Sequence, residues 1–338
     1  MIRRPATALC ALALLALTTG VGSAETLPDA QLLAKRGIAA SAAFPGYASL
    51  CNLDARIRDV NVPRDPNARR SAPARSSGER PAPKPVPPTQ VFDNLWFLGT
   101  PGVTAWLYGT EAGYILIDGL NTDEEAQDII FGGMKTLGLD PSAIKAVLVT
   151  HGHGDHYGGA DHIAETLGID VLMSQQDWDL VERLGTHPRF GPPPRRGGTV
   201  GDGDVLRFGE STLAIHLTPG HTPGTVSPVF TVSDGADDHV AMLWGGTGFN
   251  FGPNRWMFET YADSAARMER ISRAEGVDVI LSGHPGRDGT LPRLDALQTR
   301  GAGDPHPFVR GDQSLDLFAV LENCALAQAA RFAKANED

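Results

Sequence analysis

The sequence predicts a layered α/β protein, and three observations lead to this fold class. Short β-rich runs separated by glycine-containing turns begin after residue 91, strand-like and helix-like segments then alternate, and a second set of strands with further alternation follows. The composition, 41% hydrophobic and 20% charged, is that of a globular chain and excludes a wholly disordered or multi-pass membrane protein. The 338 residues suggest one or two domains, and the 39 glycines and 25 prolines indicate many turns.

The first 24 residues have the pattern of a secretory signal peptide. Two arginines precede an apolar run at 8–17, and Gly22 and Ala24 are the small residues expected before a cleavage site. We therefore predict cleavage after Ala24, a periplasmic or secreted protein, and no stable membrane insertion, because the apolar run is too short to span a bilayer. The net charge of −11 argues against nucleic acid as a partner, since phosphate binding needs a basic face.

Residues 25–90 are expected to form an N-terminal arm and a linker, with a helix over 29–43. The stretch 63–88 contains eight of the 25 prolines and several arginines, so we expect an extended surface segment that pairs with no sheet. Cys51 and Cys324 remain after cleavage, and two cysteines in an oxidising compartment predict one disulfide. Two buried free thiols are the alternative.

Residues 91–301 are expected to form the main domain, and 302–338 a C-terminal helix packed on it. Strands are predicted at 95–98, 105–108, 114–117, 147–150, 169–173, 205–208, 212–217, 226–232, 240–244 and 277–281. Helices are predicted at 123–137, 161–167, 177–184, 259–274 and 315–332. The pair Asp234–Gly235 marks a hairpin between two of the strands.

The strongest chemical pattern lies directly after the strand predicted at 147–150. Three histidines and one aspartate stand within six positions of a glycine-rich turn: His151, His153, Asp155 and His156. A turn lets side chains converge on one point instead of alternating between two faces. Because neutral imidazole and carboxylate are ligands that zinc prefers, this segment predicts a metal site rather than a solvated polar loop.

Two further histidines occupy similar positions. His221 follows the strand predicted at 212–217, His284 follows that at 277–281, and both lie in loops rich in glycine and proline. Strand ends at one edge of a sheet are where α/β proteins place their sites, so both are predicted metal ligands. The remaining histidines of the main domain and C-terminal segment are interpreted as structural: His162, His187, His216, His239 and His306.

At this point the chain resembles the metallo-β-lactamase superfamily, from about Val91 to Gly286. The resemblance rests on the segment 117–119 and on the histidines and aspartates already named, in their order and spacing. It implies a four-layer αββα sandwich, the metallo-β-lactamase fold, with the metal site at one edge between the two sheets.

The resemblance also implies roles for individual residues. His151, His153 and His221 correspond to the ligands of one Zn²⁺, and Asp155, His156 and His284 to those of a second, giving two zinc ions per chain. Asp155 is also the predicted catalytic residue, which orients a metal-bound hydroxide and relays its proton. Asp118 is expected to orient a ligand from behind without binding metal itself.

One departure narrows the resemblance. Many two-metal hydrolases of the superfamily carry a bridging aspartate after the strand that corresponds to 240–244, and the first two subclasses of β-lactamases use a cysteine there. This chain continues as Gly245–Gly246–Thr247–Gly248, with neither residue type. The pattern favours the third subclass, and whether Thr247 or Gly246 faces the metals is left open by the sequence.

The predicted function is therefore zinc-dependent hydrolysis, in which a metal-bound hydroxide opens a cyclic amide, with a β-lactam as first choice. The partner is a small molecule that carries a carboxylate. The alternatives are a lactonase or other ester hydrolase, a non-catalytic metal-binding protein, and an iron oxidoreductase using the same ligands. Candidate pocket residues are a loop at 186–198 with three arginines and a set of aromatic side chains, namely Trp106, Tyr157, Trp178, Phe249, Phe251 and Trp256.

Overall fold

The computed structural model describes residues 29–63 and 84–333. The predicted signal peptide, its cleavage site and most of the proline-rich linker lie outside these residues. Among the described residues, we find no helix that combines the length and the apolar character needed to cross a membrane.

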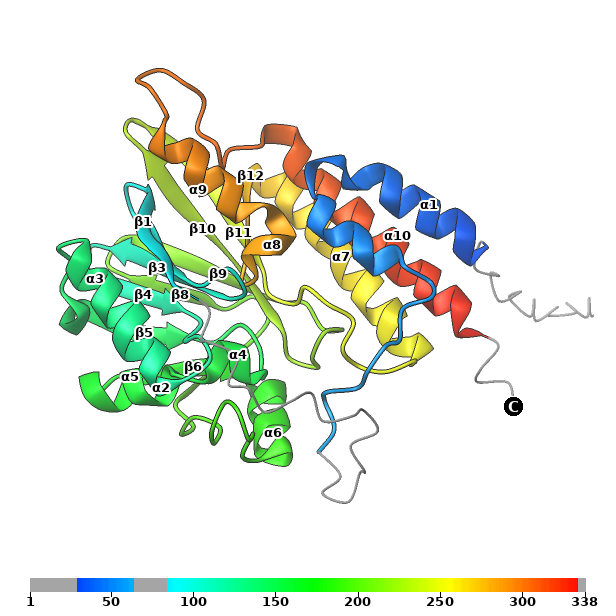
Figure 1. The fold of residues 1–338 in the computed structure, drawn as a ribbon, viewed down its shortest axis with the longest axis horizontal. Helices are drawn as coiled ribbons and strands as arrows, with labels where there is room; N and C mark the ends of the chain where they lie inside the picture. Colours follow the sequence, from blue (N-terminus) through cyan, green and yellow to red (C-terminus); the bar gives the residue numbers. More distant parts are fainter. Residues whose placement is uncertain (1–28, 64–83, 334–338) are drawn as a thin grey trace, which may run out of the picture.

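Two mixed sheets form the centre of the molecule (Figure 1). The first has seven strands in sequence order: β1 (Val86–Phe92), β2 (Leu95–Gly99), β3 (Thr104–Thr110), β4 (Gly113–Ile117), β5 (Ile144–Leu148), β6 (Asp170–Ser174) and β7 (Gly198–Val200). The second has five strands in the order β12 (Val277–Ser282), β11 (Asp237–Trp244), β10 (Val226–Asp234), β9 (Ser211–Leu217) and β8 (Val205–Phe208).

Helices cover the outer faces of both sheets. The α-helices are α1 (Ala30–Ala40), α2 (Asp123–Glu125), α3 (Gly132–Thr136), α4 (Gly154–Tyr157), α5 (Ala160–Leu167), α6 (Gln175–Leu184), α7 (Arg255–Glu275), α8 (Pro285–Asp288), α9 (Thr290–Gln298) and α10 (Asp316–Arg331). Shorter elements are η1 (Ser41–Ala43), η2 (Pro45–Cys51), the π-helical η3 (Ala126–Phe131), η4 (Pro141–Ala143) and η5 (Gly311–Leu315).

The hydrophobic core divides into three clusters that define the layers. One contains inward-facing residues of both sheets, a second joins the first sheet to η3 and α3–α6, and a third joins the second sheet to α1, α7 and α10. Strand β3 illustrates the period of two, because Trp106 and Tyr108 face the inter-sheet core while Ala105 and Leu107 face the helices. The expected αββα sandwich is confirmed.

The first strand departs from the sequence expectation. Strand β1 begins at Val86, which pairs with Gly99, and it includes Pro87 and Pro88, which the composition placed in an unpaired linker. The prolines are tolerated because β1 is an edge strand, and its register shifts between Val86 and Thr89. Helices α8 and α9 were not predicted, and the helix expected at 123–137 contains a π-helical turn in its middle.

The N-terminal arm and the last helix lie side by side, as the blue and red segments of Figure 1 show. Cys51 and Cys324 form a disulfide whose Cα atoms are 4.4 Å apart, which confirms the predicted pairing. Gly37 of α1 packs directly on this bond, since a Cβ there would stand 2.4 Å from the Cys51 sulfur. The arm is therefore fixed to the second sheet's helical layer.

Candidate metal centre

The six predicted ligands converge at one edge of the sandwich. Strand β5 leads into His151 and His153, and the short helix α4 carries Asp155 and His156. His221 follows β9, and His284 follows β12 as the N-cap of α8. Side chains separated by up to 133 positions thus meet because their strands end at the same edge.

The first trio is formed by His151, His153 and His221. The Nε2 atom of His221 lies 3.1 Å from Nε2 of His151 and 3.0 Å from Nδ1 of His153. His151 and His221 are buried, with 1% and 3% of their surfaces exposed. Three ring nitrogens therefore face one point, an arrangement that could hold a metal ion.

The second trio is formed by Asp155, His156 and His284. The Nε2 atoms of the two histidines are 3.2 Å apart, and Asp155 Oδ2 lies 3.9 Å from that of His156 and 3.8 Å from that of His284. The ligand atoms within each trio lie within 4.8 Å of one another. Asp155 and His284 are partly exposed, so this trio faces solvent more than the first.

The opposite ring nitrogen of every histidine in the first trio has a polar partner. His151 Nδ1 lies 3.0 Å from Thr150 Oγ1, His153 Nε2 lies 2.8 Å from Asn61 Oδ1, and His221 Nδ1 lies 2.6 Å from the carbonyl oxygen of Gly248. A neutral imidazole carries one N–H, so donating it outward leaves the inward nitrogen with a lone pair.

The second trio follows the same rule. His156 Nδ1 donates to Asp118 Oδ2 at 2.7 Å, and His284 Nδ1 donates to the carbonyl oxygen of Gly102 at 2.8 Å. Asp118 also accepts from the backbone N–H of Thr150, and its backbone has a positive φ of 67°. Asp118 thus lies behind His156, the place in which the sequence put an orienting residue.

The electrostatics of the first trio and of Asp155 favour the states that bind metal, whereas the surroundings of His156 favour its protonated form. Burial lowers the pKa of His151 and His221 well below the usual range, and lowers that of His153 to about 4. Burial raises the pKa of Asp155, but the neighbouring histidines outweigh this and bring it to about 2. Burial lowers the pKa of His156, yet the carboxylates of Asp118 and Asp155 raise it overall. Neutral imidazoles and an ionised carboxylate are the forms that coordinate a cation.

Two residues of the site were missed by sequence reasoning, Asn61 and Asp177. The buried carboxylate of Asp177 accepts hydrogen bonds from Gly152 N, Gly224 N and the Thr222 hydroxyl, at 2.7, 2.8 and 2.6 Å. It therefore joins the loop that carries His151 to the loop that carries His221. Asp177 is a single aspartate in a predicted helix, and no motif around it in the sequence indicates this role.

The turn after β11 is closely packed against the first trio. A Cβ added at Gly246 would stand 2.4 Å from Cβ of His221, so the backbone itself occupies this place. Trp244 Nε1 and the Tyr261 hydroxyl each donate to the Gly246 carbonyl oxygen at 2.6 Å and hold the turn in position. Gly246 is therefore the residue in contact with a predicted ligand, and Thr247 is buried beside it.

A cleft of about 950 Å³ opens beside the two trios. Its lining includes His153 and Asp155, Tyr157, the arm residues Asp59–Pro63 in part, and residues 184–190, which overlap the candidate loop at 186–198. Among the aromatic candidates, Tyr157 lines this cleft, whereas Trp106, Trp178, Phe249 and Phe251 are core residues and Trp256 is 67% exposed.

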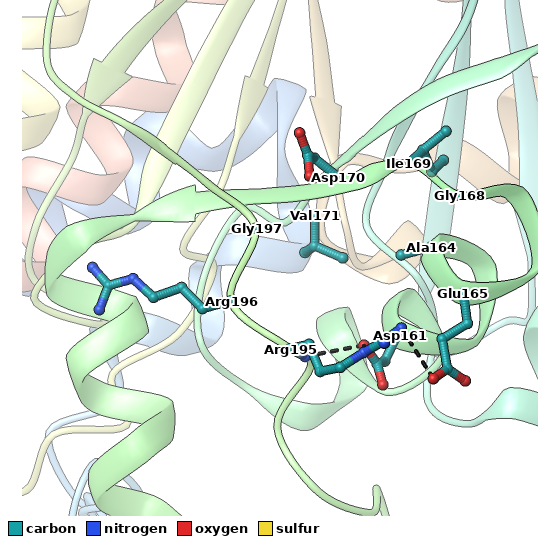
Figure 2. Close-up of a pocket in the computed structure, with 10 residues that line it drawn as sticks. All are labelled: Asp161, Ala164, Glu165, Gly168, Ile169, Asp170, Val171, Arg195, Arg196 and Gly197. Carbon is teal, nitrogen blue, oxygen red and sulfur yellow. Dashed lines mark hydrogen bonds and ion pairs between the residues drawn. The ribbon is translucent and has the colours of Figure 1, made fainter.

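The three arginines of the loop at 186–198 have different positions. Arg189 lines the cleft and lies over the ring of Phe190 at 4.9 Å. Arg195 instead lines a separate pocket, where it pairs with Asp161 and Glu165, as the dashed lines of Figure 2 mark. Arg196 lines that second pocket too, and of the three arginines only Arg189 lines the cleft.

Comparison with known proteins adds independent evidence. The family model of the metallo-β-lactamase superfamily matches residues 98–234. A probable metallo-hydrolase of Bacillus subtilis, YqgX, is 30% identical over 190 residues, which cover 53% of this chain and 80% of that protein. A hydroxyacylglutathione hydrolase of Anaeromyxobacter dehalogenans is 30% identical over 161 residues, covering 46% of this chain and 54% of that protein.

The fold has solved counterparts. The crystal structure of BJP-1, a subclass B3 metallo-β-lactamase of Bradyrhizobium japonicum, superimposes with a TM-score of 0.61 and 27% identity, covering 74% of this chain and 96% of that one. The chain spans 59% of the length of a Mycobacterium leprae relative and 65% of one from Mycobacterium tuberculosis. The fold, the family match and these likenesses agree with the expected resemblance to the third subclass, and the chain belongs to the metallo-β-lactamase superfamily.

Proposed function

We propose that the protein is a zinc-dependent hydrolase that opens β-lactam rings, with one Zn²⁺ held by His151, His153 and His221 and a second by Asp155, His156 and His284. A single observation carries the proposal. All five histidines donate their outer N–H to a polar partner, so five lone pairs and one carboxylate converge in two trios. Histidines that are only solvated or structural would not be expected to direct all their outer N–H groups away from a common centre.

The roles of the chain's own residues follow from the geometry. Zinc, when bound, polarises a carbonyl group and brings the pKa of a water molecule to about 7. Asp155 remains ionised at neutral pH and borders the cleft, so it can accept a proton from the attacking water and pass it to the leaving nitrogen. Asp118 holds His156 through Nδ1, and no covalent intermediate on a side chain is needed.

The preference for an anionic substrate rests on charge. Asp155 is the one carboxylate among the six proposed ligands, and the turn at 245–248 adds none. A metal held by the second trio would keep positive charge, and Asp155 places that trio beside the cleft, where a carboxylate next to the scissile amide could bind. Arg189 lies on the same cleft and offers a second cationic contact.

A second candidate is hydrolysis of a lactone or another activated ester. The match to a hydroxyacylglutathione hydrolase favours this alternative. The same ligand set would serve both reactions, and the difference lies in whether the substrate supplies an anion. Neutral lactones and esters gain nothing from Arg189 or from spare charge at the second metal.

The test compares substrates and metal content on one preparation. We expect about two zinc ions per chain, and a higher kcat/KM for a chromogenic cephalosporin than for a neutral chromogenic lactone. Arg189→Ala should raise KM for the cephalosporin and leave the lactone unaffected, while Arg195→Ala serves as the matched control on the separate pocket. Turnover of the lactone alone would replace the proposal by the lactonase alternative, and metal binding without turnover of either substrate would indicate a non-catalytic protein.

We further infer export to the periplasm or outside the cell. The expected arm and linker, catalytic domain and C-terminal segment at 302–338 are kept, except that the catalytic domain begins with β1 at Val86 and not at residue 91. The support for export is the N-terminal pattern and a disulfide, which oxidising compartments favour. Sequencing the N-terminus of the exported protein should give Glu25 as the first residue. An intact Met1 in the mature protein would contradict this.

A further inference from the structure

The end of the N-terminal arm lies against the first trio. Residues 58–61 run beside the segment 250–252, where Val60 N donates to Asn250 O at 2.8 Å and Gly252 N donates to Arg58 O at 3.1 Å. Asp59 also forms an isolated β-bridge with Phe251. These backbone contacts deliver the side chain of Asn61 to a defined place, although the arm belongs to neither sheet.

The carboxamide of Asn61 contacts two of the three histidines of the first trio. Its Nδ2 donates to the carbonyl oxygen of His221 at 2.9 Å, and its Oδ1 lies 2.8 Å from Nε2 of His153. The His221 carbonyl can only accept, so Nδ2 must face it and Oδ1 must face His153. An amide oxygen can only accept as well, and His153 must therefore carry its proton on Nε2.

We propose that Asn61 is a positioning residue of the first metal site: it fixes the Nε2–H tautomer of His153, so that Nδ1 presents its lone pair to the metal, and it ties His153 to His221. His153 faces the trio through Nδ1, whereas His151 and His221 do so through Nε2. The N-terminal arm is then part of the metal centre. The inference rests on the proposed ligation by His153 but not on the proposed substrate.

The other outer partners come from the sandwich itself, as Thr150, Asp118, Gly102 and Gly248. Asn61 is the one partner supplied from the arm, and the remaining contacts of the arm end involve backbone or Arg183. Removing its side chain therefore removes the outer acceptor of His153 without changing any strand or metal ligand.

The variants are Asn61→Ala and Asn61→Asp, with Asn94→Ala as the matched control. Asn94 makes the same pair of contacts at a distance from the site, since its Nδ2 donates to Thr231 O at 3.2 Å and its Oδ1 accepts from Ser233 N at 3.0 Å. We expect Asn61→Ala to weaken the first zinc site about tenfold to a hundredfold, measured by competition with a chelating indicator, and to leave the second site within threefold. Asn61→Asp retains the acceptor for His153 but places a carboxylate oxygen against the His221 carbonyl, so it should keep the Nε2–H tautomer and lose part of the zinc affinity. Asn94→Ala should bind both metals normally.

A second readout does not require metal. Nitrogen-15 NMR of the histidine rings in zinc-free protein should give His153 as the Nε2–H tautomer in the wild type and a mixture of tautomers in Asn61→Ala. Equal zinc affinities for Asn61→Ala and Asn94→Ala, or an unchanged His153 tautomer, would overturn the inference. If the wild type binds no zinc, the proposed function fails, and the tautomer measurement still decides the role of Asn61.

Discussion

Asp118 Oδ2 and His156 Nδ1 form a 2.7 Å hydrogen bond in which both side chains are 1% exposed. The same oxygen accepts from the Thr150 hydroxyl at 3.1 Å, and the other oxygen accepts from the Thr150 backbone N–H at 2.8 Å. A single carboxylate thus connects the strand end that precedes His151 to a histidine of the second trio. The three groups that contact this carboxylate, Thr150 N–H, the Thr150 hydroxyl and His156 Nδ1–H, all donate to it, so both of its oxygens act as acceptors.

Asp118→Asn should weaken the second metal site about tenfold to a hundredfold. The variant's amide nitrogen would face a donor, either Thr150 or His156, and the ring of His156 would lose its fixed tautomer. Asparagine tolerates the positive φ of 67° at this position, so the backbone should be retained. Titration with zinc and a chelating indicator measures the effect, and unaltered affinity at both sites would contradict the orienting role.

Asp155→Asn should remove the second metal selectively and lower turnover at least about a hundredfold. The amide loses both the anionic ligand and the group that accepts a proton. Metal analysis should give close to one zinc ion per chain. If the variant keeps two metals and wild-type turnover, Asp155 is neither ligand nor proton acceptor.

Gly246→Ala should disturb the first trio, whereas Gly248→Ala should not. A Cβ at Gly246 would meet His221 at 2.4 Å, while the nearest atom to a Cβ at Gly248 is 3.7 Å away on Asn250. Neither glycine has a positive φ, so the two variants differ in space rather than in backbone strain. Zinc affinity of the first site measures the difference, and we expect a loss for Gly246→Ala alone. Equal behaviour of the two variants would disprove the packing argument.

Replacing both Cys51 and Cys324 by alanine should lower the free energy of unfolding by up to about 5 kcal/mol in the chain-entropy account, because the bond closes a loop of 273 residues. Urea unfolding of the variant and of reduced wild type should give similar midpoints, both below that of the oxidised protein. Reaction of both thiols with a labelling reagent in unreduced native protein would show that the bond is absent in solution.

Asp288→Asn should change how stability depends on pH. Burial raises the pKa of Asp288 to about 6, and its Oδ2 has no hydrogen-bond partner among the described residues. A folded-state pKa above the unfolded value of 3.8 gives stability that is present at low pH and lost as pH rises through about 6. The wild type should therefore lose up to about 3 kcal/mol relative to the variant between pH 4 and pH 7. Urea unfolding of both proteins at the two pH values, each with excess chelator, measures this, and a constant difference would contradict the raised pKa.

The sequence predicted a metal site because its residues follow strands, and parallel strands bring their carboxyl ends to one edge. The division into two trios came from the family resemblance. His221 and His284 could be placed in this way without any knowledge of side-chain contacts. Asn61 and Asp177 could not, because each acts through hydrogen bonds to loops more than 20 positions away. A lone polar residue has no periodicity or spacing that would mark such a contact.

The errors in the fold have similar causes. The composition assigned Pro87 and Pro88 to a linker. They can stand in β1 because it is an edge strand, where a residue without a backbone N–H need not donate to a neighbouring strand. Arg195 and Arg196 were grouped with Arg189 by proximity in sequence, and the loop turns so that they face another pocket. Local composition does not determine on which side of a loop a long side chain lies.

The contact between the arm and helix α10 also sets an order of events during synthesis. Cys51 is made early, but its partner Cys324 emerges only 273 residues later, after all six trio residues have been added. Until Cys324 is available, the arm is not linked covalently to the rest of the chain, and the disulfide cannot help to keep Asn61 beside His153. A nascent chain can thus assemble both trios before the arm is locked in place, and the earliest segment of the described chain is the last to be secured.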